Sequence, residues 1–212
     1  ISKASQKLFS WAELLKPSGK GISKSVQMGF WGEMFVLDQY VSKVHPIKDA
    51  ISFWIGPEQK KQDFTLNHMA LEVKTTMSGS GSTIKISSLE QLDKITDHLY
   101  LIHVFINKGN APDSLSLKDL YDQIIESIND DTETKANFLF SASKIYGKAT
   151  DAQRNEKFTF VDYNLYEIDE NFPIISSNEL PDAIRSVRYE IETSKISSFK
   201  IEMPMEDVIK NE

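Results

Sequence analysis

Cysteine is absent from this 212-residue chain, and glycine and proline are scarce, at nine and seven residues. The absence of cysteine excludes disulfides, cysteine-bound zinc, iron–sulfur clusters and thiol catalysis. No apolar run approaches the ~20 residues that span a bilayer, and no signal peptide is visible, so we expect a cytoplasmic protein without a membrane partner. With 40% hydrophobic and 26% charged residues, the composition is that of an ordinary globular protein.

Motifs of several enzyme classes are also missing. There is no P-loop, no dinucleotide-binding glycine pattern and no nucleophile elbow. The four histidines show no spacing typical of a metal site, and we expect His103, in an apolar segment, to be a core residue. The chain starts at Ile1 rather than at a methionine, which is consistent with a processed form or a fragment, so an upstream domain is a candidate partner.

The charge of the chain is unevenly distributed. The net charge of −7 argues against a protein that coats nucleic acid by charge alone. Residues 1–100 carry 12 Lys and Arg against 10 Asp and Glu, whereas residues 101–212 carry 12 against 21. A locally basic, substrate-facing surface in the first part fits this distribution, but asymmetry of this size is common.

The periodicity of the apolar residues predicts an α/β protein with a mixed sheet. Helices are expected at residues 1–15, from Ser23 or Ser25 to about Tyr40, from 87 onward, at 117–128 and at 133–146, with a helical turn at 180–184. Strands are expected at residues 50–55, 63–66, 69–74, 83–86, 158–168, 186–191 and, at the sheet centre, 99–106. We divide the chain into an N-terminal helix and linker (1–20), one main domain (21–200) and a loosely held acidic tail (201–212).

Residues 63–76, D-F-T-L-N-H-M-A-L-E-V-K-T-T, predict a β-hairpin with unusual charges. If residues 67–68 form a two-residue turn, Asp63 lies directly opposite Glu72 on one face. Carboxylates on directly opposed strand positions, with Cβ atoms ~4.5–5.5 Å apart, repel each other unless a cation compensates them. A divalent cation does this far better than a neighbouring lysine. A register slip of one residue would place the carboxylates on opposite faces.

These residue types suit the hydrolysis of a phosphodiester. Asp63, Glu72 and the carbonyl of Val73 make an all-oxygen site for Mg²⁺, which Mn²⁺ can replace. The metal would polarise a phosphate and lower the pKa of a bound water. Lys74 would activate or orient that water, or stabilise the developing charge. The alternative is an amphipathic hairpin at the edge of a sheet.

The E-x-K triplet is a weak signal by itself, because one is expected roughly once in a chain of this size. Residues 133–135 (E-T-K) are a second example. They follow N-D-D-T, lack β-prone flanks, and are typical of the solvated first turn of a helix. Residues 72–74 (E-V-K) differ in their apolar strand context and in the upstream Asp63, which leaves the metal site and the structural hairpin as equal alternatives on these features.

Further motifs flank the hairpin: G-F-W-G-E (29–33), W-I-G-P (54–57), D-F (63–64), E-V-K-T-T (72–76), I-S-S-L-E-Q-L (86–92), F-P-I-I (172–175), L-P-D-A-I (180–184) and V-R-Y-E-I (187–191). Over about residues 25–195 they resemble the PD-(D/E)XK nuclease superfamily, and more narrowly a bacterial group associated with restriction and phage defence. The resemblance implies a restriction-endonuclease-like three-layer α/β/α sandwich with a central mixed sheet, an αβββαβ core and C-terminal helical and strand additions. The proline of the superfamily name is missing, because Gln62 precedes Asp63.

Carried over by position, the resemblance makes Asp63 and Glu72 metal ligands and Lys74 the catalytic lysine. It adds Glu33, on the preceding helix, as a carboxylate that completes the metal shell or holds a second ion. The alternative for Glu33 is a glutamate on a helix surface.

The resemblance also makes Gln91 a catalytic residue that reaches the active-site lysine or the substrate phosphate, with an exposed helix position as the alternative. Three hydroxyl residues, Thr75, Thr76 and Ser88, are candidate donors to the substrate phosphates. As helix caps and loop residues they are equally well explained.

The function that the resemblance implies is Mg²⁺-dependent cleavage of DNA by an endonuclease of bacterial restriction or anti-phage defence. The partners are then DNA, other defence proteins or an upstream domain, and a second copy in a homodimer. A rival is an inactive nuclease-fold module that binds nucleic acid or a partner protein in a defence complex. We rank it second because Asp63, Glu72 and Lys74 are all retained. A third alternative is a structural domain whose acidic second half binds a partner protein.

Overall fold

The computed structural model describes residues 21–56, 62–80, 82–176 and 180–211, so the helix and linker expected at 1–20 lie outside the described residues. The chain divides into two compact units. Of the described residues, those within 1–58 and 108–159 form the first, which we call the helical unit, and those within 59–107 and 160–212 form the second, the sheet unit. None of the helices in the described ranges has the length and apolarity that crossing a bilayer demands.

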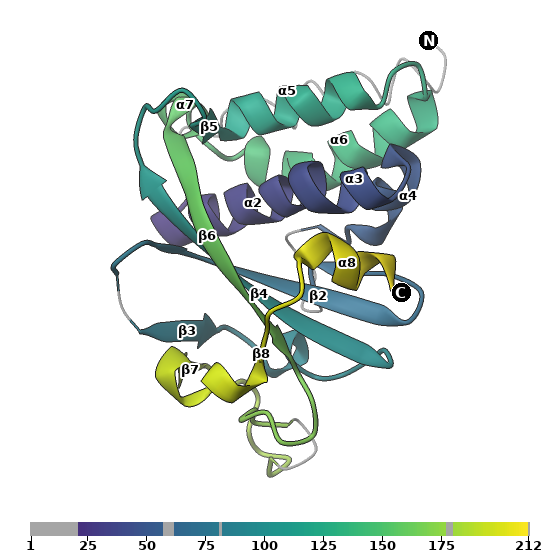
Figure 1. Cartoon of the computed structure of the whole chain (residues 1–212). Coiled ribbons are helices and arrows are strands. Elements are labelled where there is room, and N and C mark those ends of the chain that lie inside the picture. The colour runs from purple at the N-terminus through teal and green to yellow at the C-terminus, as the bar shows by residue number, and fades with distance from the viewer. Residues whose placement is uncertain (1–20, 57–61, 81, 177–179, 212) are drawn as a thin grey trace. The chain divides into compact units, whose positions relative to one another are not determined.

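The helical unit is labelled in Figure 1. It contains α2 (Lys24–Val36), the π-helical η1 (Leu37–Val41), α3 (Ser42–Val44), α4 (Ile47–Phe53), β5 (Leu115–Ser116), α5 (Leu117–Ser127), α6 (Thr132–Tyr146) and α7 (Asp151–Asn155). Helix α2 begins where the sequence predicts, because the Ser23 hydroxyl accepts a hydrogen bond from the Val26 N–H at 3.2 Å. Ser116 and Asp119 form a capping box at the start of α5. The helices expected at 117–128 and 133–146 are confirmed, as α5 and α6.

The strand expected at residues 50–55 is wrong, because most of this segment belongs to α4. Its run A-I-S-F-W-I is short and apolar, and periodicity does not separate a buried strand from a buried helix in so few residues. Pro46 precedes the helix and its carbonyl accepts the Ala50 N–H at 3.0 Å. The helical period then buries Ala50 and Ile51 on one side.

Aromatic side chains dominate the core of the helical unit. The Trp31 ring stacks on Phe35 with centroids 4.8 Å apart. Trp54 lies 6.2 Å from Phe30 and 5.9 Å from Phe138, measured between ring centroids. Both tryptophans are buried. Large aromatic side chains bury much apolar area and add favourable ring–ring contacts, so they hold α2, α4 and α6 together.

The sheet unit is built on a mixed sheet in which β1 (Phe64–Thr65), β2 (Met69–Met77), β4 (His98–Lys108) and β6 (Lys157–Glu167) are neighbours in that order. Strand β1 is antiparallel to β2, and β2 is parallel to β4. Strand β8 (Lys200–Ile201) pairs with β6, while β3 (Thr83–Ile86) and β7 (Tyr189–Glu192) form a separate two-stranded sheet (Figure 1). The first residues of β6 belong to the helical unit, where Phe158 pairs with Leu115 of β5. The α/β class with a mixed sheet, and β4 between other strands, are confirmed.

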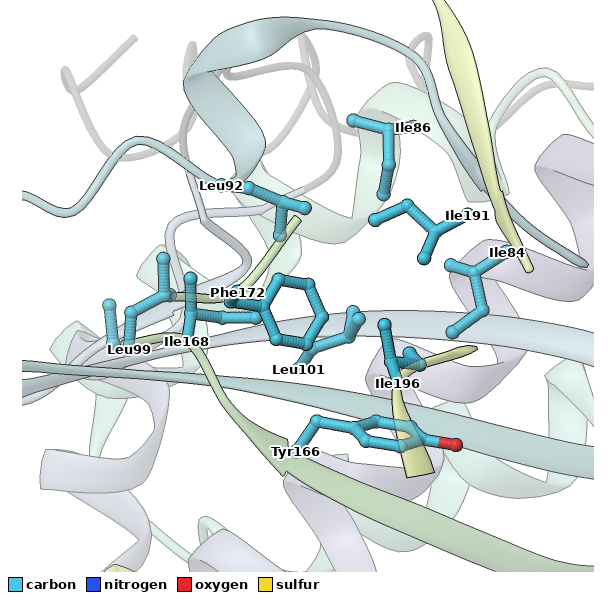
Figure 2. Packing of buried hydrophobic residues seen from close by; sticks show 11 residues of the cluster. Ile84, Ile86, Leu92, Leu99, Leu101, Tyr166, Ile168, Phe172, Ile191 and Ile196 are labelled. Carbon is cyan, nitrogen blue, oxygen red and sulfur yellow. The ribbon is translucent and has the colours of Figure 1, made fainter. Parts of the chain in front are cut away.

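A hydrophobic cluster joins the two sheets of this unit (Figure 2). It combines Ile84 and Ile86 of β3, Ile191 of β7, and Leu99 and Leu101 of β4. Burying each such side chain contributes about 1.5–3 kcal/mol. Because the cluster also includes a residue of β2, Ala70, it fixes the strand that carries the E-V-K triplet.

Three elements of the sheet unit differ from expectation. The helix expected from residue 87 is a single 3₁₀ turn, η2 (Leu89–Gln91), since the apolar stripe is not continued and Ile95 is exposed. The helical turn expected at 180–184 is an ordinary turn, in which the Ile184 N–H donates to the Pro181 carbonyl at 2.9 Å. The tail expected to be loosely held forms α8 (Met205–Lys210), which buries Met205, Val208 and Ile209 at helical spacing. Between them, η4 (Thr193–Lys195) and η5 (Ser197–Phe199) follow β7.

Candidate active site in the hairpin of β1 and β2

The hairpin has the register that the sequence predicts. The Leu66 N–H donates to the Met69 carbonyl at 2.8 Å and closes a two-residue turn. Phe64 then pairs with Leu71, and continuing this register places Asp63 opposite Glu72. Asp63 extends the pairing through its side chain, because its Oδ2 accepts a hydrogen bond from the Val73 N–H at 2.7 Å. The backbone of β2 therefore orients the Asp63 carboxylate.

Glu72 and Lys74 lie on the same face of β2, as the alternation of a strand requires. The Lys74 Nζ is 2.6 Å from the Glu72 Oε1, and the exposed fractions of the two side chains are 14% and 1%. The Glu72 Oε2 is buried and has no hydrogen-bond partner among the residues that the structure describes. A buried carboxylate oxygen without a partner is costly, so the position is suited to a ligand that supplies positive charge.

Burial controls the protonation of this pair of carboxyl groups. Burial and, to a smaller extent, the neighbouring Asp63 raise the pKa of Glu72 to about 8, against the opposing effect of Lys74. Burial also raises the pKa of Asp63 to about 6, opposed by Lys74 and by the Val73 N–H. Both pKa values rise despite the short ion pair because the loss of hydration on burial is the largest effect on each carboxyl group. A bound cation would reverse this balance and favour both ionised forms.

The donor set fits a hard divalent cation, because it consists of oxygens. Asp63 and Glu72 supply carboxylates, and the Val73 carbonyl remains the predicted third oxygen. Within the described ranges, no three histidine, aspartate or glutamate side chains are grouped closely enough to hold a metal ion. Glu33 belongs to the helical unit, where its Oε2 accepts a hydrogen bond from the Trp54 Nε1–H at 3.0 Å. Its part in metal binding stays a prediction, but its carboxylate is buried and oriented, unlike that of a surface glutamate.

The side chain of Gln91 stabilises its own turn. Its Oε1 accepts a hydrogen bond from the Ser87 N–H at 2.9 Å, which ties the end of η2 to the backbone two residues before its start. This contact explains the residue structurally, and its predicted catalytic role stays untested.

Two of the hydroxyls predicted to bind substrate are buried, and a third contacts a histidine. The Thr76 Oγ1 lies 2.9 Å from the His103 Nε2. Burial lowers the pKa of His103 to about 4, so this imidazole is neutral at pH 7. His103 pairs in register with Lys74 and shares its face of the sheet, a proximity that sequence reasoning missed. The Thr75 Oγ1 and Ser88 Oγ are buried and have no hydrogen-bond partner in the described part of the chain.

Gln62 is a further residue whose role sequence reasoning missed. Its Nε2 donates to the carbonyls of Glu90 at 2.9 Å and Asp93 at 2.8 Å, and its side chain is buried. It therefore fastens the residue before Asp63 to the η2 turn. In the sequence, the only indication of a role for Gln62 was its position directly before Asp63, where the superfamily motif has proline. The contacts themselves join residues about thirty positions apart.

Replacing Gln62 by alanine should lower the free energy of unfolding by about 1–3 kcal/mol, because the buried Gln62 amide no longer donates to the carbonyls of Glu90 and Asp93. Urea denaturation followed by circular dichroism measures this change. The matched control is Gln123→Ala, since Gln123 is an exposed glutamine of α5, and it should change stability by less than about 0.5 kcal/mol. Equal effects of the two substitutions would contradict the anchoring role.

Sequence comparison connects this geometry with a family. Residues 1–194 match the family described as "Putative PD-(D/E)XK family member" (DUF4420). No curated protein and no solved structure matches the chain. The matched region includes α2, the β1–β2 hairpin with Asp63, Glu72 and Lys74, and the strand β7, whereas α8 lies beyond it. With most of its length matched, the chain belongs to this family of the PD-(D/E)XK superfamily, a group of nuclease type.

Proposed function

We propose that the protein is a metal-dependent endonuclease that hydrolyses the phosphodiester bonds of DNA. The observation that carries this proposal is the hairpin itself. Asp63 lies opposite Glu72, and Lys74 lies 2.6 Å from Glu72 on a strand anchored in the core. Because the chain belongs to the PD-(D/E)XK family, we assign these three residues to the superfamily's named acidic residues and lysine.

Mg²⁺ is the cofactor that we propose, and Mn²⁺ should replace it. Asp63, Glu72 and the Val73 carbonyl would hold it, with Glu33 as a further candidate. The unpartnered Glu72 Oε2 supports this assignment, because it is a buried acceptor without a donor among the described residues. When bound, the metal supplies Lewis-acid polarisation of a phosphate and a water of lowered pKa.

The side chains of the hairpin have separate tasks in this proposal. Asp63 is held by the Val73 N–H and Glu72 by Lys74, so both carboxylates are fixed before substrate arrives. The Lys74 ammonium lies in a largely buried position, where a charge acts more strongly than in water. It is placed to orient the attacking water and to stabilise the negative charge that develops on the phosphate.

The biological setting rests on the resemblance alone. We propose that the protein acts in the cytoplasm of bacteria, in restriction or anti-phage defence. DNA is the proposed substrate, and other defence proteins, an upstream domain or a second copy are the proposed partners.

A second candidate function is a catalytically inactive module that binds nucleic acid or a partner protein. The observation that favours it is the lack, in the described residues, of a third acidic side chain grouped with Asp63 and Glu72. The retained Lys74 and its short contact with Glu72 favour the nuclease.

The test is incubation with supercoiled plasmid and with linear DNA, in Mg²⁺, in Mn²⁺ and in EDTA. We expect nicked or linear product from the plasmid in the presence of metal, no product in EDTA, and none from Asp63→Asn. The control is Asp113→Asn, a substitution at an exposed aspartate of the helical unit, which should cleave like the wild type. DNA binding without cleavage under any of these conditions would instead support the inactive module.

A further inference from the structure

A pocket of about 290 Å³ opens in the sheet unit. One wall is the segment 88–90 around the η2 turn, and the other is the segment 180–187. These are the segments of two motifs, S-S-L-E-Q-L and L-P-D-A-I, which the hydrolytic mechanism does not use. The structure thus brings two characteristic but unexplained motifs together around one space.

One cation of this pocket lacks a partner among the described residues. The Arg185 side chain lines the pocket and makes no ion pair or hydrogen bond with them. The Ser88 Oγ also makes no hydrogen bond in the described part of the chain, but it is buried and does not face the open space. A guanidinium at a pocket can donate to the acceptors of a ligand.

The charge of the lining decides between ligand classes. Arg185 is the one cation of the described lining, whereas Glu90 and Asp182 are carboxylates, so the lining carries a net negative charge. This balance disfavours a free phosphate, which is itself an anion. Apolar side chains, among them Leu89 and Ile184, form other parts of the wall. A flat, uncharged ligand with both donors and acceptors on its edge meets all of these conditions.

We propose that this pocket binds a single nucleobase, with the Arg185 guanidinium donating to its edge. This inference rests on the proposed function for its substrate, DNA. The volume lies at the small end of the range for ligand pockets, which suits one base rather than a longer segment. A base enters such a pocket only when it is unstacked, in a single strand or flipped from a duplex.

The Gln62 side chain connects this pocket with the active site. It donates to the carbonyls of Glu90 and Asp93, and it immediately precedes Asp63 in the chain. Gln62 therefore fixes both the wall of the pocket around η2 and the backbone next to the Asp63 carboxylate. Occupation of the pocket would contribute a preference for particular bases near the cleaved bond, because a guanidinium discriminates between the acceptor patterns of bases.

The experiment titrates the isotope-labelled full chain in EDTA with each of the four deoxynucleosides and, separately, with inorganic phosphate, and follows backbone amide signals by NMR. We expect at least one deoxynucleoside to shift the signals of Ser88 and Arg185, and inorganic phosphate to leave them unchanged. Arg185→Ala should weaken the binding roughly tenfold or more. The control Arg188→Ala removes the same charge at an exposed position outside the lining and should bind like the wild type.

Three results would overturn the proposal: no shift with any deoxynucleoside, equal shifts with inorganic phosphate, or equal weakening by Arg185→Ala and Arg188→Ala. Thermal unfolding of both variants confirms that they are folded. Because EDTA prevents metal-dependent cleavage, base binding is measured independently of activity. A protein that binds deoxynucleosides but never cleaves DNA would refute the endonuclease and keep the pocket, whereas a cleaving enzyme that fails the titration would refute the pocket alone.

Discussion

Replacing Lys74 by alanine should slow DNA cleavage roughly 10²–10⁴-fold, because the substitution removes the ammonium that lies 2.6 Å from the Glu72 carboxylate. The measurement is the single-turnover rate on plasmid DNA at saturating Mg²⁺. DNA affinity should fall much less, since the contribution of the lysine is largest when charge develops on the phosphate.

The matched control is Lys85→Ala. Lys85 lies on β3 of the same unit, its side chain is 79% exposed, and its nearest carboxylate, Glu190, is 3.7 Å away. Its removal should change the cleavage rate by no more than a few-fold. Lys74→Met keeps the apolar stem of the lysine and separates loss of charge from loss of packing. If Lys74→Met is folded and cleaves DNA at the wild-type rate, the lysine has no catalytic part.

The hairpin could be predicted because its determinants are local. A two-residue turn and strict alternation fix which residues face each other, and the observed pairing of Phe64 with Leu71 matches that arithmetic. The second E-x-K triplet shows the importance of context. Asp131 caps the start of α6 by accepting the N–H groups of Glu133 and Thr134, and Glu133 is exposed, as expected for a solvated first turn.

The predictions of helices and strands were wrong where the local sequence pattern and the tertiary environment favour different structures. The apolar residues 50–55 look like a buried strand, but helix α4 buries Ala50 and Ile51 equally well. In the acidic tail, the charges obscured an apolar spacing of three and four residues in Met205, Val208 and Ile209, which packing converts into a helix. In both segments, burial against the rest of the unit outweighs the local signal.

The supporting contacts of the site could not be predicted, because they join residues distant in the chain. Gln62 reaches carbonyls about thirty residues away, and Thr76 meets His103 across neighbouring parallel strands. Trp54 similarly holds the carboxylate of Glu33 from another helix segment. Composition and periodicity predict which residues carry the chemistry, but which side chains hold them in place depends on the fold.

In the absence of divalent cations, the stability of the protein should fall by about 2 kcal/mol between pH 6.5 and pH 8. Burial raises the pKa of Glu72 to about 8, above that of an unfolded glutamate, so the folded state holds a proton that the unfolded state has released. Stability from this group is present at low pH and is lost as the pH rises through about 8. Urea midpoints measured in EDTA at a series of pH values report the slope, and Glu72→Gln should remove it.

Above pH 6.5 the change in stability reports on Glu72, because Asp63, His103 and Glu156 have lower pKa values in the folded protein. The pKa of His103 is lowered to about 4, so His103 makes stability rise with pH up to about 6.5 and opposes the fall due to Asp63 over much of that range. The pKa of Glu156 is lowered to about 2, and its contribution is lost only in acid. Mg²⁺ should reverse the fall, because it binds the ionised carboxylates and stabilises the folded state increasingly at higher pH. A flat profile in EDTA, or the same decline in Glu72→Gln, would show that Glu72 is already ionised at neutral pH and that Lys74 alone compensates its charge.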